Sequence, residues 1–168
     1  PDSRQLTSAR DLAILSRAVM RDFPQYYHYL GQHDWAYNGR NYRNTNGLLG
    51  AGAGFDGIKT GFTNASGYNL AASQVRDGRR LITIVLGGRS SATRNTHVAE
   101  LMNVGFEVER LRGQGQTIQV AQAFFEQRGF GVGPDNAPAS PIQYASLRDE
   151  DETASGSNEV TYVAAAVG

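Results

Sequence analysis

Apolar residues recur at helical spacing close to the start of the chain. Four of them lie three or four positions apart, namely Leu12, Leu15, Val19 and Phe23. This spacing predicts an amphipathic helix over residues 7–23, on which these four side chains form one apolar stripe. Ser8 followed by Asp11 is typical of a helix start with a capping box, and Pro24 cannot continue the helix.

The middle of the chain has the alternation and the tight turns of an antiparallel sheet. Asn38-Gly39 is typical of a type I′ turn and predicts a hairpin over residues 35–43. Asp77-Gly78 predicts a second tight turn of the same kind. We expect three consecutive antiparallel strands, at residues 55–62, 68–75 and 81–86. The last strand is an unbroken apolar run, which indicates burial on both faces of the sheet.

A second helix is predicted directly after the third strand, over residues 91–103. Its apolar face consists of Val98, Leu101 and Met102. Gly105 is typical of a residue that closes such a helix, and residues 106–112 suit one further helical turn.

The last third of the chain differs in composition from the rest. From residue 129 it consists mostly of glycine, proline, serine, alanine and acidic residues. Such a segment cannot bury enough apolar surface to form a core. We therefore divide the chain into one domain over residues 1–112 and a linker or disordered low-complexity tail over residues 113–168. Residues 160–167 are apolar enough to begin a further element.

The overall composition excludes several classes of protein. Sixteen basic and sixteen acidic residues give a net charge of zero, which argues against nucleic-acid binding. The absence of cysteine excludes disulfide frameworks, thiol catalysis and cysteine-ligated zinc. The chain begins with Pro1 and not with methionine, so we expect it to be a piece of a longer protein.

Lys59 is the only lysine among the sixteen basic residues, so chemistry that needs a lysine has one candidate. It begins the tripeptide Lys59-Thr60-Gly61 on the first predicted strand. Because side chains alternate along a strand, Lys59 and Gly61 share one face and Thr60 points to the other. A glycine beside an ammonium leaves room for a ligand, although an ordinary exposed lysine would have the same local sequence. The tripeptide by itself leaves both interpretations open.

The longer segment over residues 56–70 separates these interpretations. It resembles the third active-site motif of the low-molecular-mass penicillin-binding proteins, the serine-type D-alanyl-D-alanine carboxypeptidases. Further segments resemble the same family in the same order, at residues 1–2, 7–13, 23–27, 44–49 and 86–90, then at Arg94 and residues 105–106. The resemblance covers about residues 1–112, and the ordered set is far more specific than Lys-Thr-Gly alone.

The resemblance implies an α+β fold of the β-lactamase/transpeptidase-like type, with an antiparallel sheet flanked by helices. This chain would supply the C-terminal half of that domain. The family uses three motifs, Ser-x-x-Lys, Ser-x-Asn and Lys-Thr-Gly. The first serine attacks the D-Ala-D-Ala peptide carbonyl and forms an acyl-enzyme, which water then hydrolyses. Penicillin mimics the substrate and is trapped at the acyl stage. No metal or organic cofactor is implied.

The same resemblance assigns roles to the third motif and to one arginine. Lys59 corresponds to the lysine that manages protons and negative charge near the serine of the second motif. The Thr60 hydroxyl and the Arg94 guanidinium bind the terminal carboxylate of the substrate, and the backbone N–H of Phe62 forms half of the oxyanion hole. Gly61 belongs to the same substrate-binding strand. Arginine suits a carboxylate because its guanidinium can hold both oxygens.

Two of the three motifs are missing from this sequence. The residue three positions before Lys59 is Asp56, so there is no Ser-x-x-Lys, and no Ser-x-Asn triplet occurs. In the family both motifs lie upstream of the segment that corresponds to Pro1. We therefore expect the nucleophile and its activating lysine outside this chain, and we expect the isolated chain to be inactive. Some relatives carry histidine where this chain has Phe62, so only the backbone role transfers.

The function that the resemblance implies is peptidoglycan maturation and cell-shape control. The expected partners are stem peptides ending in D-Ala-D-Ala, β-lactam antibiotics and the upstream half of the same domain, with no nucleic acid. The expected location is periplasmic or otherwise extracytoplasmic, with membrane association through segments outside this chain. The alternatives are a D,D-endopeptidase or a β-lactamase on the same fold, or a non-catalytic wall-binding fragment.

Overall fold

The computed structural model describes residues 2, 4–116 and 161–166 of the chain. Its helices are α1 (Ala9–Asp22), α2 (Ser91–Gly113) and the 3₁₀ helices η1 (Pro24–Gly31) and η2 (Leu49–Ala51). Its strands are β1 (Asp34–Tyr37), β2 (Arg40–Arg43), β3 (Phe55–Thr63), β4 (Gly67–Arg76), β5 (Arg79–Gly88) and β6 (Thr161–Ala166). None of the helices within these ranges is long and apolar enough to cross a membrane.

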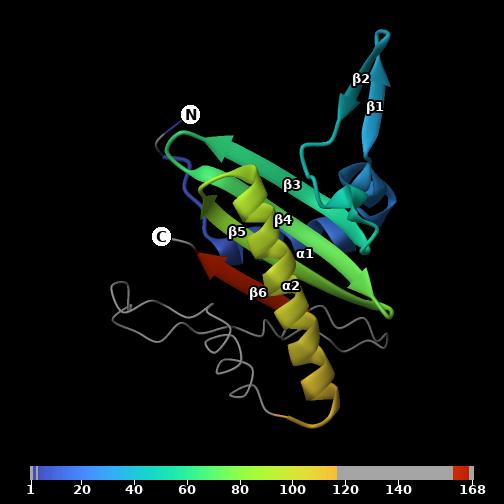
Figure 1. Cartoon of the computed structure of the whole chain (residues 1–168), viewed down its shortest axis with the longest axis vertical. Coiled ribbons are helices and arrows are strands. Elements are labelled where there is room, and N and C mark those ends of the chain that lie inside the picture. The colour runs from blue at the N-terminus through green and yellow to red at the C-terminus, as the bar shows by residue number, and fades with distance from the viewer. Residues whose placement is uncertain (1, 3, 117–160, 167–168) are drawn as a thin grey trace.

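The main sheet has helices on both faces, as expected for the predicted α+β fold. The sheet has the strand order β3-β4-β5-β6, and its first three strands form the predicted antiparallel meander. Helix α2 crosses one face and α1 lies on the other (Figure 1). On the α2 face, Leu70, Leu81 and Val85 pack against Val98, Leu101 and Met102. On the α1 face, Ala71, Ile82 and Ile84 pack against Ala13.

The contact face of α1 differs from the predicted apolar stripe. The capping box is present, because the Ser8 side chain accepts a hydrogen bond from the Asp11 amide at 3.1 Å. However, the buried residues of the helix are Ala13 and Ser16, whereas Leu15 is 58% exposed and Phe23 is 52% exposed. Leu12 of the predicted stripe, together with Ala9 and Met20, is partly buried and packs against the same cluster. The spacing therefore predicted the helix correctly and its contact face only in part, since Leu12 meets the sheet while Leu15 and Phe23 are exposed.

Helix α2 is longer than predicted. Gly105 does not close it, because the helix continues from Ser91 to Gly113 and Gly105 is buried within it. A glycine inside a helix costs about 1 kcal/mol relative to alanine. Burial of Val104 and Val108 against the sheet offsets that cost. The prediction of one further turn over residues 106–112 is confirmed, but as part of the same helix.

The predicted hairpin projects from the sheet as β1 and β2 (Figure 1). Asn38 and Gly39 both have positive φ angles, of 48° and 71°, as a type I′ turn requires. Asp77 and Gly78 repeat this geometry between β4 and β5, with φ angles of 50° and 77°. Both tight turns are therefore where the sequence predicted them.

The segment assigned to the tail contributes a fourth strand to the sheet. Strand β6 pairs with β5 in parallel, in a register that places Leu81 opposite Thr161 and Leu86 opposite Ala166. The sheet is therefore mixed at this edge and not wholly antiparallel. Residues 117–160 lie outside the described part of the chain, so the boundary at residue 112 and the disordered tail stay predictions.

Candidate active site

Strand β3 carries the Lys-Thr-Gly motif at an edge of the sheet. In the described part of the chain it pairs only with β4, so its other edge is open. Lys59 lies opposite Ala71, which packs toward α1, and Thr60 lies opposite Leu70, which packs toward α2. Residues opposite one another in an antiparallel pair share a face, so Lys59 and Thr60 belong to opposite faces, as the sequence predicted.

Lys59 is exposed, and its ammonium contacts the strand itself. Its Nζ donates a hydrogen bond to the carbonyl oxygen of Thr60 at 2.5 Å. No carboxylate forms an ion pair with this ammonium among the described residues. A positive charge at an open strand edge, without a fixed counter-ion there, suits a site where negative charge develops.

Thr60 has a partner that the sequence did not reveal. Its Oγ1 lies 2.6 Å from Oγ1 of Thr45, in the loop before β3. Thr45 belongs to the segment over residues 44–49 that resembles the family, but nothing in the sequence indicated a role for it. The pair brings that loop onto the motif strand and leaves two hydroxyls together. Each can donate or accept, which suits a site for a carboxylate or another polar group.

Arg94 lies in the first turn of α2 and is almost completely buried, with 3% of its surface exposed. Its Nη1 donates to the Asn69 carbonyl oxygen at 3.3 Å, and Nε and Nη2 donate to the Asn95 side-chain oxygen at 3.1 and 2.8 Å. Burial lowers the pKa of Arg94, because the charged guanidinium loses hydration there. These acceptors are all neutral.

Asn69 connects Arg94 to the motif strand. It lies opposite Gly61 in the β3–β4 register, so the arginine is one strand away from the motif. Its side-chain oxygen accepts from the Gly87 amide at 2.9 Å, and its side-chain nitrogen donates to the Gly67 carbonyl at 3.1 Å. Asn69 thus holds the ends of β4 and β5 beside the motif, and sequence reasoning did not single it out.

Gly61 and Phe62 complete the predicted set. Gly61 is exposed, and a Cβ added there would come no closer than 3.9 Å to any neighbour. The Phe62 ring packs on Tyr68, with 4.4 Å between ring centroids, and Phe62 is 54% exposed. Alternate backbone N–H groups of an edge strand point away from its partner. The structure therefore brings Thr60, Gly61 and Arg94 to one end of the meander, and the oxyanion role of Phe62 stays a prediction.

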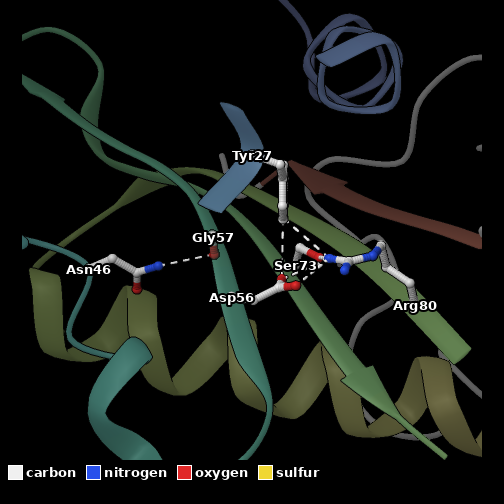
Figure 2. A network of polar contacts seen from close by, with 6 residues as sticks. All are labelled: Tyr27, Asn46, Asp56, Gly57, Ser73 and Arg80. Carbon is white, nitrogen blue, oxygen red and sulfur yellow. Dashed lines mark hydrogen bonds and ion pairs between the residues drawn. The ribbon is translucent and has the colours of Figure 1, made fainter. Parts of the chain in front are cut away.

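A polar network holds the beginning of the same strand (Figure 2). Asp56 forms an ion pair with Arg80 of β5, and Tyr27 of η1 donates a hydrogen bond to it. On the other side, the buried Asn46 donates to the carbonyl oxygen of Gly57 at 3.1 Å. The peptide bond between Gly57 and Ile58 is cis.

Comparison with known proteins identifies one family. A family model described as D-alanyl-D-alanine carboxypeptidase matches residues 2–90, which is more than half of the chain. A curated relative, the D-alanyl-D-alanine carboxypeptidase DacD from Salmonella typhimurium, is 42% identical over 102 residues. That match covers 60% of this chain and 26% of the relative, so the chain spans about a quarter of the relative's length.

Solved structures agree with this match. Penicillin binding protein 6B from Escherichia coli is 37% identical and superposes with a TM-score of 0.56, over 61% of this chain and 33% of its own. Penicillin-binding protein D2 from Listeria monocytogenes, in its cefotaxime-bound form, is 33% identical with a TM-score of 0.52, over 57% of this chain and 39% of its own. The chain therefore belongs to the D-alanyl-D-alanine carboxypeptidase family.

Proposed function

We propose that this chain is part of a serine-type D-Ala-D-Ala carboxypeptidase that trims peptidoglycan stem peptides through an acyl-enzyme. The observation that carries the proposal is the arrangement at one end of the β-meander. There the Lys59-Thr60-Gly61 strand has an open edge, and the buried Arg94 bonds to Asn69, the residue opposite Gly61. The exposed ammonium of Lys59 at the strand edge and the buried guanidinium of Arg94 one strand away suit a substrate with a carboxylate and a reacting carbonyl.

Each residue has a task that follows from its chemistry. The Lys59 ammonium stabilises the negative charge that develops on the reacting groups during acylation. The Thr60 hydroxyl and the Arg94 guanidinium hold the free carboxylate at the end of the peptide, since a guanidinium can hold both carboxylate oxygens. The Phe62 N–H supplies one donor of the oxyanion hole. The nucleophilic serine and its lysine come from the upstream part of the domain.

Binding of β-lactams and the cellular location belong to the same proposal. A β-lactam would acylate the serine and be trapped there, as the cefotaxime-bound relative from Listeria monocytogenes supports. Stem peptides are found outside the cytoplasmic membrane, so we propose a periplasmic or otherwise extracytoplasmic location and a role in cell shape. Fractionation of cells that carry an epitope-tagged gene product would test the location.

The test uses the intact gene product that contains this chain. It should release D-alanine from a pentapeptide muropeptide and take a covalent label from fluorescent penicillin. Replacement of Lys59 with alanine should slow both reactions about 100-fold, the scale of losing one electrostatic stabiliser. Lys59→Arg keeps the charge but not the compact ammonium, and serves as the matched comparison. Cleavage of cross-linked dimers without D-alanine release would indicate an endopeptidase. The absence of both reactions would indicate a non-catalytic wall-binding protein.

A further inference from the structure

Asp56 is the extra residue of a β-bulge at the start of the motif strand. Phe55 lies opposite Gln74 and Gly57 lies opposite Ser73, so Asp56 has no partner on β4. Asp56 and Gly57 are both directed toward η1. The Asp56 carboxylate accepts from Tyr27, and a Cβ added to Gly57 would lie 2.8 Å from the Tyr27 hydroxyl. A bulge of this kind re-aims side chains and shifts the alternation of the residues that follow it.

One nitrogen of Arg80 holds the bulged residue in place. Arg80 Nη1 lies 2.8 and 2.6 Å from the two carboxylate oxygens of Asp56 and 2.6 Å from the Ser73 hydroxyl (Figure 2). The Tyr27 hydroxyl donates to Asp56 Oδ1 at 3.2 Å and accepts from the same Nη1 at 3.3 Å. The ion pair is partly shielded from solvent, with 29% of the Arg80 side chain and 35% of the Asp56 side chain exposed. It joins β3, β4, β5 and η1 at one point.

The hydroxyl of Tyr27 stays a donor over the whole physiological range. Burial raises the pKa of Tyr27, because the phenolate would lose hydration. The Tyr27 hydroxyl therefore remains a donor to the Asp56 carboxylate at neutral pH.

The opposite side of the bulge is tied to the site through Asn46. Asn46 is 4% exposed, and its side-chain nitrogen donates to the Gly57 carbonyl. The bulge is thus held on one side by Arg80 and Tyr27 and on the other by Asn46. Asn46 is next in sequence to Thr45, whose hydroxyl contacts that of Thr60.

We propose that Asp56 and Arg80 are positioning residues, whose ion pair keeps the bulge in place and thereby sets the register that presents Lys59 and Thr60. The catalytic consequence rests on the proposed function. Lys59 follows Asp56 by three residues on the same strand. If the bulge were lost, the strand would slip by one residue, and a slip of one residue exchanges the two faces of a strand. Lys59 would then take the face that Thr60 occupies now.

The test measures acylation by fluorescent penicillin in the intact gene product, per folded molecule, below the melting temperature of every variant. Asp56→Asn and Arg80→Gln should lower the first-order acylation rate constant about 10- to 100-fold, because Lys59 no longer stabilises negative charge in molecules whose strand has slipped, and full loss of such a stabiliser costs about 100-fold. Arg80→Lys should keep most of the rate, because all the polar contacts of Arg80 in this network come from one nitrogen. Arg110→Gln is the control, because it removes a distant ion pair with Glu107 on α2.

A second readout does not depend on activity. Nuclear Overhauser contacts between Lys59 and Ala71 report the β3–β4 register in the wild type and in the same variants. The proposal predicts that these contacts weaken in Asp56→Asn and Arg80→Gln and persist in Arg80→Lys and Arg110→Gln. If the wild type takes no label, the proposed function fails, and the register contacts still decide the positioning role.

Two results would overturn the positioning role. One is an unchanged register in Asp56→Asn and Arg80→Gln. The other is an acylation rate per folded molecule that is the same in these variants as in Arg110→Gln. If either variant does not fold, Ser73→Ala gives the milder test, because it removes one contact of Arg80 and leaves the ion pair. Ser73→Ala should weaken the register contacts and slow acylation relative to Arg110→Gln, by less than the loss of about 10- to 100-fold given for Asp56→Asn. No difference from Arg110→Gln in either measurement would overturn the positioning role.

Discussion

Arg94 is a charged residue in the buried interior, where proteins normally provide a counter-ion. It is buried, and among the described residues only neutral oxygens accept from its guanidinium. A buried charge is costly unless it is paired. A substrate carboxylate would supply the missing charge, and this supports the carboxylate-binding role that we propose for Arg94.

The carboxylate role of Arg94 predicts a difference between two substrates. In the intact gene product, Arg94→Ala should slow release of D-alanine from a peptide with a free terminal carboxylate about 10- to 100-fold, the scale of a hydrogen bond to a charged group. A peptide amidated at that end should lose much less, and Arg94→Lys should not restore the rate for the free acid. Steady-state kcat/KM with both peptides measures this. Equal losses for acid and amide would show that Arg94 is only structural.

At the scale of elements, the sequence predicts which segments are helices and strands better than it predicts how they pack. The turns at Asn38-Gly39 and Asp77-Gly78 were predictable because local backbone geometry specifies their residues. The bulge at Asp56 was not predictable, because the partners that hold Asp56, Tyr27 and Arg80, are distant in sequence. The pairing of Thr45 with Thr60 was missed for the same reason. Long-range contacts leave no signal in a single local pattern.

The corrected contact face of α1 can be tested by two opposite substitutions. Ala13 is 2% exposed against β5, so Ala13→Leu should overpack this contact and lower the free energy of unfolding by about 1–3 kcal/mol. Leu15 is 58% exposed, so Leu15→Ala should change it by less than about 0.5 kcal/mol in the 168-residue chain. Urea unfolding followed by circular dichroism gives both values. A larger loss of stability in Leu15→Ala than in Ala13→Leu would show that the stripe predicted from spacing is the contact face.

At the scale of the whole molecule, the described part of the chain leaves one edge strand of the sheet unpaired on its outer side. It also leaves several apolar side chains exposed. The outer edge of β3 is open, and Ile14 and Leu15 are both about half exposed. The matched relatives are longer, since this chain spans about a quarter of the DacD sequence. An open edge and an uncovered apolar surface favour self-association.

The 168-residue chain by itself should take no covalent label from fluorescent penicillin. It has no Ser-x-x-Lys, because its single lysine follows Asp56 by three residues. Nucleophile and activating base act as a unit, so the remaining motif should not sustain acylation. A denaturing gel of the labelled chain, run beside the intact gene product, measures this. A labelled band at 18.2 kDa would place a nucleophile within this sequence.

The parallel strand β6 also determines an order of folding. The meander from β3 to β5 is made by tight turns between neighbours in sequence, whereas Thr161 pairs with Leu81, eighty residues earlier (161 − 81). Closing so long a loop costs more chain entropy than forming a hairpin, and contacts between distant residues form slowly. During synthesis from the N-terminal end, β5 leaves the ribosome long before its partner does. The edge of β5 is therefore open to chaperones, or to other nascent chains, until residues 161–166 are made.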